Sequence, residues 1–104
     1  MTRLGREAPL PDEVQGRWTD VDDQTVELIV QGGEVACFGK IVAYDYKIVV
    51  SNDGALTINL KIEDESKEDT FQRENITGLV VTPEGELHAY NVKFASQFVR
   101  LSDS

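Results

Sequence analysis

The stretch ALTINLKIE, residues 55–63, carries the clearest structural pattern in this chain. Every second residue is apolar, so that four side chains share one face of an extended strand: Leu56, Ile58, Leu60 and Ile62. The other face carries threonine, asparagine, lysine and glutamate. This alternation is typical of an antiparallel strand that buries one face and leaves the other in water. We therefore predict a half-buried β-strand at this position.

The same period of two recurs from residue 16 onward, in short runs separated by turn residues. Glycine pairs, and glycine beside asparagine, aspartate or proline, favour tight turns, and they stand at residues 32–33, 52–54 and 83–85. No long window has the 3.6-residue period of a helix; only residues 10–15 indicate a single helical turn, and residues 64–69 indicate an acidic loop. We expect an all-β fold, a short antiparallel up-and-down meander of about eight strands closed into a barrel.

The length of 104 residues suits one domain with one modest core. We expect residues 1–11, with Pro9 and Pro11, to form a flexible N-terminal arm, residues 12–101 to form a single β-barrel domain, and residues 102–104 to be frayed. No apolar run is long enough for a secretory signal or a membrane span, and a single cysteine excludes an internal disulfide framework. The sequence therefore favours a cytoplasmic protein.

The chain is strongly acidic, with 19 Asp and Glu against 10 Lys and Arg and a formal net charge of −9. This balance argues against nucleic acid and anionic membranes as partners, because both need a positive surface. The acidic residues gather in two clusters, around Asp22 and around Glu65. The first cluster does not match the calcium-binding loop pattern, because Thr25 stands in place of the turn glycine and Gln31 in place of the final glutamate. We expect solvated loops and no metal site.

Three residues at the ends of the predicted meander carry a family resemblance. Gly16-Arg17-Trp18 opens the first strand, and Arg100 stands near the end of the last. This arrangement resembles the signature of the lipocalin-like (calycin) barrels, in which a Gly-x-Trp motif meets a basic residue from the final strand. The resemblance implies a lipocalin- or streptavidin-like barrel, with Trp18 plugging one end and the Arg100 guanidinium covering its ring. The chain is much shorter than ordinary lipocalins, and the resemblance transfers no ligand.

The usual catalytic side chains are scarce. His88 is the only histidine and has no nucleophile motif beside it, and Cys37 lies in an alternating run where a small buried hydrophobic residue is the ordinary role. We nominate no catalytic residue, no metal ligand and no cofactor. We expect a protein that is not an enzyme.

The aromatic residues are the best candidates for a binding site. An apolar ring with one hydrogen-bonding tip suits the wall of a small-molecule pocket, and an eight-stranded barrel has room for one small ligand or is filled by its own side chains. The candidates are Tyr44, Tyr46, Tyr90, Phe38 and Phe71. The leading hypothesis is a small barrel that binds a small, apolar, neutral or cationic ligand at its open end.

The alternative is a protein-interaction or inhibitor module, in which the N-terminal arm or the acidic loop binds a basic protein partner. The sequence is compatible with either a monomer or a homodimer.

Overall fold

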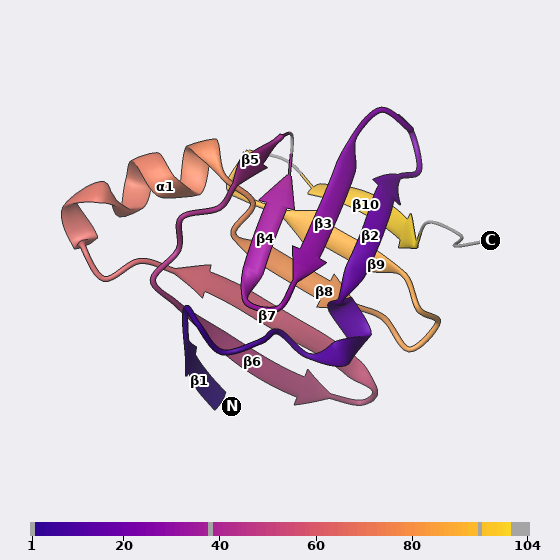
Figure 1. The fold of residues 1–104 in the computed structure, drawn as a ribbon, viewed down its shortest axis with the longest axis horizontal. Helices are drawn as coiled ribbons and strands as arrows, with labels where there is room; N and C mark the ends of the chain where they lie inside the picture. Colours follow the sequence, from indigo (N-terminus) through magenta and orange to yellow (C-terminus); the bar gives the residue numbers. More distant parts are fainter. Residues whose placement is uncertain (1, 38, 94, 101–104) are drawn as a thin grey trace.

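The computed structural model describes residues 2–37, 39–93 and 95–100 (Figure 1). Ten strands, two 3-10 turns and one helix follow one another: β1 (Thr2–Gly5), η1 (Asp12–Val14), β2 (Gly16–Asp20), β3 (Glu27–Gln31), β4 (Glu34–Cys37), β5 (Lys40–Ile41), β6 (Tyr46–Asn52), β7 (Ala55–Lys61), η2 (Glu65–Lys67), α1 (Glu68–Glu74), β8 (Gly78–Val81), β9 (Leu87–Tyr90) and β10 (Ala95–Arg100). The frayed end predicted at residues 102–104 lies outside the described residues.

The strands form one antiparallel sheet in the order β1-β6-β7-β8-β9-β10-β2-β3-β4-β5. From β6 to β10, and again from β2 to β5, strands that follow one another in the chain are neighbours in the sheet, and β10 pairs with β2. The sheet curls around a single core, as a half-barrel (Figure 1). The prediction of an all-β, antiparallel, barrel-like fold is confirmed.

The predicted hairpin turns lie where the glycines stand. Gln31 faces Glu34 across the Gly32-Gly33 turn, and Asn52 faces Ala55 across Asp53-Gly54. Asp53 and Gly54 both have positive φ, 53° and 83°, as a two-residue type I′ turn requires.

The inward face of the sheet is filled by its own side chains. The strand at 55–61 turns Leu56, Ile58 and Leu60 inward, as its alternation predicts. The largest fully buried apolar side chains from the remaining strands and connections are Trp18, Phe98, Leu28, Ile76, Leu79, Leu87, Val14, Val30 and Val35. Packing at these positions is the main stabilising term of the fold.

The sheet is closed differently from the expected continuous ring of strands. Its two end strands in the described ladder are β1 and β5, and the gap between them is bridged by the chain around residues 6–10. The Leu10 amide donates to the Gly32 carbonyl at 2.8 Å, and Arg6 Nη1 donates to the Gly33 carbonyl at 2.7 Å. Two short strands that the sequence pattern does not indicate, β1 and β5, raise the number of strands from about eight to ten.

Residues 1–11 were expected to form a flexible arm. In the structure this segment packs against the barrel from residue 2 onward. Strand β1 pairs with β6 in the register Thr2–Val49 to Gly5–Tyr46, and Leu10 is buried in the core. The prolines in this segment keep it extended without preventing it from docking.

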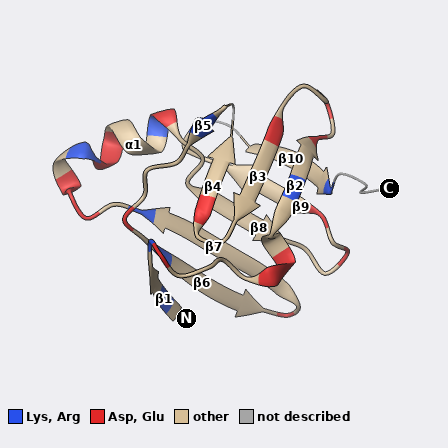
Figure 2. Ribbon diagram, viewed as in Figure 1, with Lys and Arg blue, Asp and Glu red and all other residues tan. Residues whose placement is uncertain are grey.

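The acidic loop expected at residues 64–69 is instead η2 and the first turn of α1, which covers one end of the sheet (Figure 1). The acidic residues of the protein gather on this helix, on η1 and on the strand connections, while the strands themselves carry few (Figure 2). Within the described residues, no helix is long and apolar enough to cross a membrane.

Candidate functional site

Of the four aromatic candidates that the structure describes, one, Phe71, lines a cavity large enough for a ligand. Phe38 lies outside the described residues. Tyr44, Tyr46 and Tyr90 are described, and each of them has a structural role away from the lining of that cavity.

Tyr44 is buried in the core with its hydroxyl in a polar cluster. The hydroxyl donates to the Gly33 carbonyl and accepts a hydrogen bond from Lys47 Nζ at 3.1 Å. Burial raises the pKa of Tyr44 above its ordinary value. Burial lowers the pKa of Lys47, which is fully buried, and the positive charge of Arg6 nearby lowers it further.

Tyr46 and Tyr90 lie on the outer face of the sheet. The guanidinium carbon of Arg3 lies 3.9 Å from the centroid of the Tyr46 ring. The Tyr90 ring lies across Gly78, its partner on the neighbouring strand, and its hydroxyl is 3.4 Å from Asn59 Oδ1.

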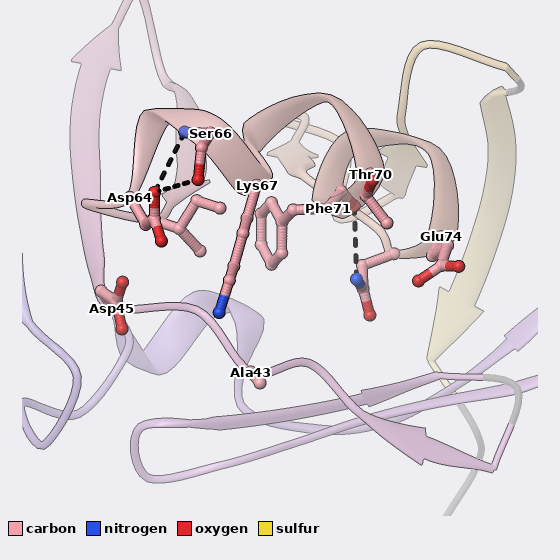
Figure 3. A pocket seen from close by; sticks show the side chains of 10 residues that line it. Ala43, Asp45, Asp64, Ser66, Lys67, Thr70, Phe71 and Glu74 are labelled. Atoms are coloured by element: carbon pink, nitrogen blue, oxygen red, sulfur yellow. Dashed lines mark hydrogen bonds between the residues drawn. The ribbon is translucent and has the colours of Figure 1, made fainter.

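The cavity that contains Phe71 has a volume of about 470 Å³ and lies between α1 and the connection from β5 to β6 (Figure 3). We call it the helix pocket. Three of its lining residues are apolar and the others are polar or charged; the lining residues are Ala43, Asp45, Ile62, Asp64, Ser66, Lys67, Thr70, Phe71, Glu74 and Asn75.

Local hydrogen bonds fix the walls of the helix pocket. Asp64 Oδ1 accepts from the backbone amide of Ser66 at 3.0 Å and from its hydroxyl at 2.6 Å, which begins η2 and lowers the pKa of the Asp64 carboxyl. Asp45 Oδ2 accepts from the backbone amide of Glu63 at 2.9 Å. At the other end, Asn75 Nδ2 donates to the Phe71 carbonyl at 3.2 Å and ends the helix.

The helix pocket is negatively charged. Three carboxylates line it, Asp45, Asp64 and Glu74, against the single ammonium of Lys67, so that its formal charge is −2. Figure 3 shows the Lys67 side chain reaching from the helix across the pocket, beside the Phe71 ring. Among the described residues, no hydrogen bond or ion pair involves the side chain of Lys67 or of Glu74. The Lys67 ammonium acts on the Asp64 carboxylate through its charge and helps to lower the pKa of that carboxyl, so Glu74 is the carboxylate most available to a ligand.

The three residues that carry the family resemblance, Gly16, Trp18 and Arg100, meet at the opposite end of the sheet. The Arg100 guanidinium carbon lies 4.3 Å from the centroid of the Trp18 ring, and its two terminal nitrogens donate to the carbonyls of Gln15 and Glu13, at 2.6 and 3.0 Å. Trp18 Nε1 donates to the Val14 carbonyl at 3.0 Å. At Gly16 a Cβ would lie 2.7 Å from Arg100 Nη1, so the glycine leaves the space that the arginine fills.

His88 and Cys37 lie away from the helix pocket. His88 is half-buried on the outer face of β9, and Cys37 is buried in the core. Within the described part of the chain, no three His, Cys, Asp or Glu side chains are grouped so that they could hold a metal ion.

Sequence reasoning missed the polar half of the pocket, Asp45, Asp64, Lys67 and Glu74. The only sequence signal for these residues was the charged run at 63–69, which we interpret as a loop. In the structure the second part of this run belongs to helix α1, which also carries Phe71.

Comparisons of this chain with models of protein families, with curated protein sequences and with solved structures found no match.

Proposed function

We propose that this chain is a binding protein, not an enzyme, and that it holds a small ligand with an apolar body and a neutral or cationic polar group. The helix pocket carries the proposal, because it places the apolar side chains of Ile62 and Phe71 beside three carboxylates at one end of a filled barrel. Its volume of about 470 Å³ falls in the range of roughly 300–1,000 Å³ that is usual for small-molecule sites.

The charge of the pocket favours a cation over an anion. A formal charge of −2 attracts an ammonium group and repels a carboxylate, and partial shielding from water strengthens both effects. Lys67 supports the same preference, since its own side chain is an alkyl ammonium that the pocket accommodates along the Phe71 ring (Figure 3).

The placement of the reactive side chains supports binding over catalysis. The histidine and the cysteine do not line the helix pocket. Its hydroxyls, Ser66 and Thr70, therefore have no imidazole beside them to act as a general base.

The alternative of an interaction module that uses the N-terminal arm receives less support. Both basic residues of this arm already contact the same chain. Arg3 stacks on Tyr46 and forms an ion pair with Glu63. Arg6 lies over the Tyr44 ring and donates to the Gly33 carbonyl.

The proposal is tested by titrating the labelled protein with three aromatic probes of similar size and recording its amide NMR spectrum. Benzylamine, benzyl alcohol and benzoate differ mainly in charge. We expect shifts at the amides of residues 43–45 and 62–75, in the affinity order benzylamine, benzyl alcohol, benzoate.

A blocked variant provides the control. Ala43→Trp places a large side chain at the wall of the pocket, whereas Ala95→Trp places the same side chain on an exposed strand position outside it. Loss of binding in the first variant alone supports the proposal. If none of the three probes moves the pocket amides, or if Ala95→Trp weakens binding equally, the proposal is wrong.

A further inference from the structure

The edge of β6 holds an extended piece of chain, residues 2–8, which we call the N-terminal segment. Its first half is β1, which pairs with β6 and, in the described sheet, with no other strand. Its second half turns at residues 5–8, where the Ala8 amide donates to the Gly5 carbonyl at 3.3 Å. The segment is thus recognised by one strand edge and by the side chains around it.

A buried lysine forms hydrogen bonds with the backbone of this segment. Lys47 Nζ donates to the carbonyls of Gly5 at 2.7 Å and Ala8 at 2.6 Å, and its third hydrogen bond goes to the Tyr44 hydroxyl. All three donors of the ammonium are therefore used, two of them by the N-terminal segment. Any chain that occupies this edge must supply two carbonyls at the same positions.

Two aromatic rings form cation–π contacts with the basic side chains of the segment. Arg3 stacks on Tyr46, and the guanidinium carbon of Arg6 lies 4.7 Å from the centroid of the Tyr44 ring. Close to this point a Cβ on Gly33 would overlap the Arg6 carbonyl oxygen, so the glycine allows the segment to approach the β3–β4 turn. The site selects an extended segment with arginines three residues apart.

This site is costly to leave empty. Removal of the segment would take two of the three acceptors from the Lys47 ammonium, which is buried while the segment is in place, and would leave the edge of β6 unpaired. After its own segment has detached, the site on the β6 edge therefore strongly favours rebinding, either of that segment or of another segment that fits.

We infer that the β6 edge and Lys47 form a strand-acceptor site that also takes the N-terminal segment of a second copy of this chain, giving a strand-exchanged dimer. The second copy supplies the same carbonyls and the same arginines, so that the contacts of the site are conserved in the exchange. Pro9, between the segment and the buried Leu10, is the hinge. Because a short tether holds its own segment at an effective concentration of the order of millimolar, exchange grows as the protein concentration approaches that range.

Two single-cysteine variants test this inference in the full chain. In a Cys37→Ala background, Thr2→Cys places a thiol on the segment, and Val49→Cys places one at its partner position on β6. The two proteins are mixed, unfolded, refolded together and oxidised, and the covalent heterodimer is measured by mass spectrometry and non-reducing gel electrophoresis.

The control replaces Val49→Cys with Asn52→Cys, an exposed position on the same strand that faces Ala55 and not the segment. We expect a heterodimer between the Thr2→Cys and Val49→Cys proteins that rises several-fold for a tenfold increase in protein concentration. The Asn52→Cys mixture is expected to stay at the level of random collision. If the two mixtures give equal yields at every concentration up to about 1 mM, β6 accepts only the segment of its own chain and the inference is overturned.

Discussion

Gly16 is the residue on which the packing of Trp18 and Arg100 depends most directly. It has a φ of 115°, a conformation that side chains with a Cβ rarely adopt, and a Cβ there would meet Arg100 Nη1. We predict that Gly16→Ala lowers the free energy of unfolding by about 2 kcal/mol or more, because backbone strain of about 1–3 kcal/mol is joined by loss of the Arg100 bond to Gln15. Urea denaturation followed by the fluorescence of Trp18, the single tryptophan, measures this change.

Gly32→Ala is the matched control, since Gly32 also has a positive φ, 59°, but no atom lies within 4 Å of its missing Cβ. The loss in free energy of unfolding of Gly32→Ala should therefore reflect the backbone strain alone. Introducing Gly16→Ala into an Arg100→Met background separates the two parts, and an unchanged cost in that background would show that the arginine is not involved.

The buried hydroxyl of Tyr44 makes stability depend on alkaline pH. Because the pKa of Tyr44 is raised in the folded state, the folded protein keeps this proton at pH values where the unfolded chain, with the ordinary value of 10.0, has released it. Stability contributed by this group is therefore present below about pH 10 and is lost as the pH rises further. We predict that Tyr44→Phe costs about 1 kcal/mol at pH 7, through its lost hydrogen bonds, and that this cost shrinks above pH 10.

The lowered pKa of Lys47 acts in the opposite direction, because the unfolded lysine holds its proton up to about pH 10.5 after the folded one has lost it. Because Lys47 Nζ donates to the Tyr44 hydroxyl, Tyr44→Phe changes the titration of the lysine as well, and the difference between the two unfolding curves reports the coupled pair. Parallel pH profiles of the two proteins between pH 7 and 11 would contradict the assignment.

At the scale of elements, the pairing of β8 with β9 depends on a glycine covered by an aromatic ring. The Tyr90 ring occupies the space that a side chain at Gly78 would need. We predict that Gly78→Ala destabilises the protein by about 1–3 kcal/mol, because the methyl group forces the ring out of its position. In a Tyr90→Ala background the same change should be neutral or stabilising, since alanine without a clash is about 0.5–1 kcal/mol better than glycine in a strand.

Thermal unfolding of the four proteins of this cycle measures the coupling. A cost of Gly78→Ala that is the same with and without the tyrosine ring would show that the ring does not fill this space.

Elements with a strong local pattern were predictable from the sequence, and elements stabilised by distant contacts were not. Residues 55–61 alternate cleanly, and the turns at 32–33 and 53–54 carry glycine where a positive φ is needed. Helix α1 has seven residues and buries only Phe71, too little for a helical period to be visible. Strand β1 is specified by the edge of β6 and by Lys47, which are more than 40 positions away in the sequence.

The same difference between local pattern and distant contacts explains which residues of the candidate site were predictable from the sequence. Phe71 was identified because aromatic residues are informative on their own. The carboxylates of Asp45 and Glu74 come from segments that only the folded chain brings together, and their local sequence predicts solvated charge. Tyr44, by contrast, was expected in a ligand site, and the structure uses it to satisfy a buried lysine.

For the whole molecule, the open side of the sheet raises the question of what holds the half-barrel together. Sheet pairing runs without a break from β1 to β5 through β10 and β2, so that the remaining gap lies between the two end strands. Across this gap the contacts are polar: Tyr44 and Arg6 meet at the Gly33 carbonyl, and Lys47 holds the turn at residues 5–8. The closure thus combines a partly buried cluster of hydrogen bonds around Lys47 and Gly33 with the docking of Leu10, whereas apolar packing dominates the core.

Replacing the lysine at the centre of this cluster should therefore open one side of the molecule without unfolding the rest. Lys47→Met keeps the apolar stem, removes the cost of a buried charge, and leaves two carbonyls and a hydroxyl without their donor. We predict a net loss of about 1–3 kcal/mol, with faster hydrogen exchange at the amides of β1 and β6 and unchanged exchange at those of β8 and β9. Lys61→Met, on the outer face of the neighbouring strand, is the control and should leave both regions protected. If exchange in Lys47→Met rises evenly over all strands, the cluster stabilises the fold as a whole and does not act as a local closure. If neither stability nor exchange changes, other contacts of the N-terminal segment close the barrel.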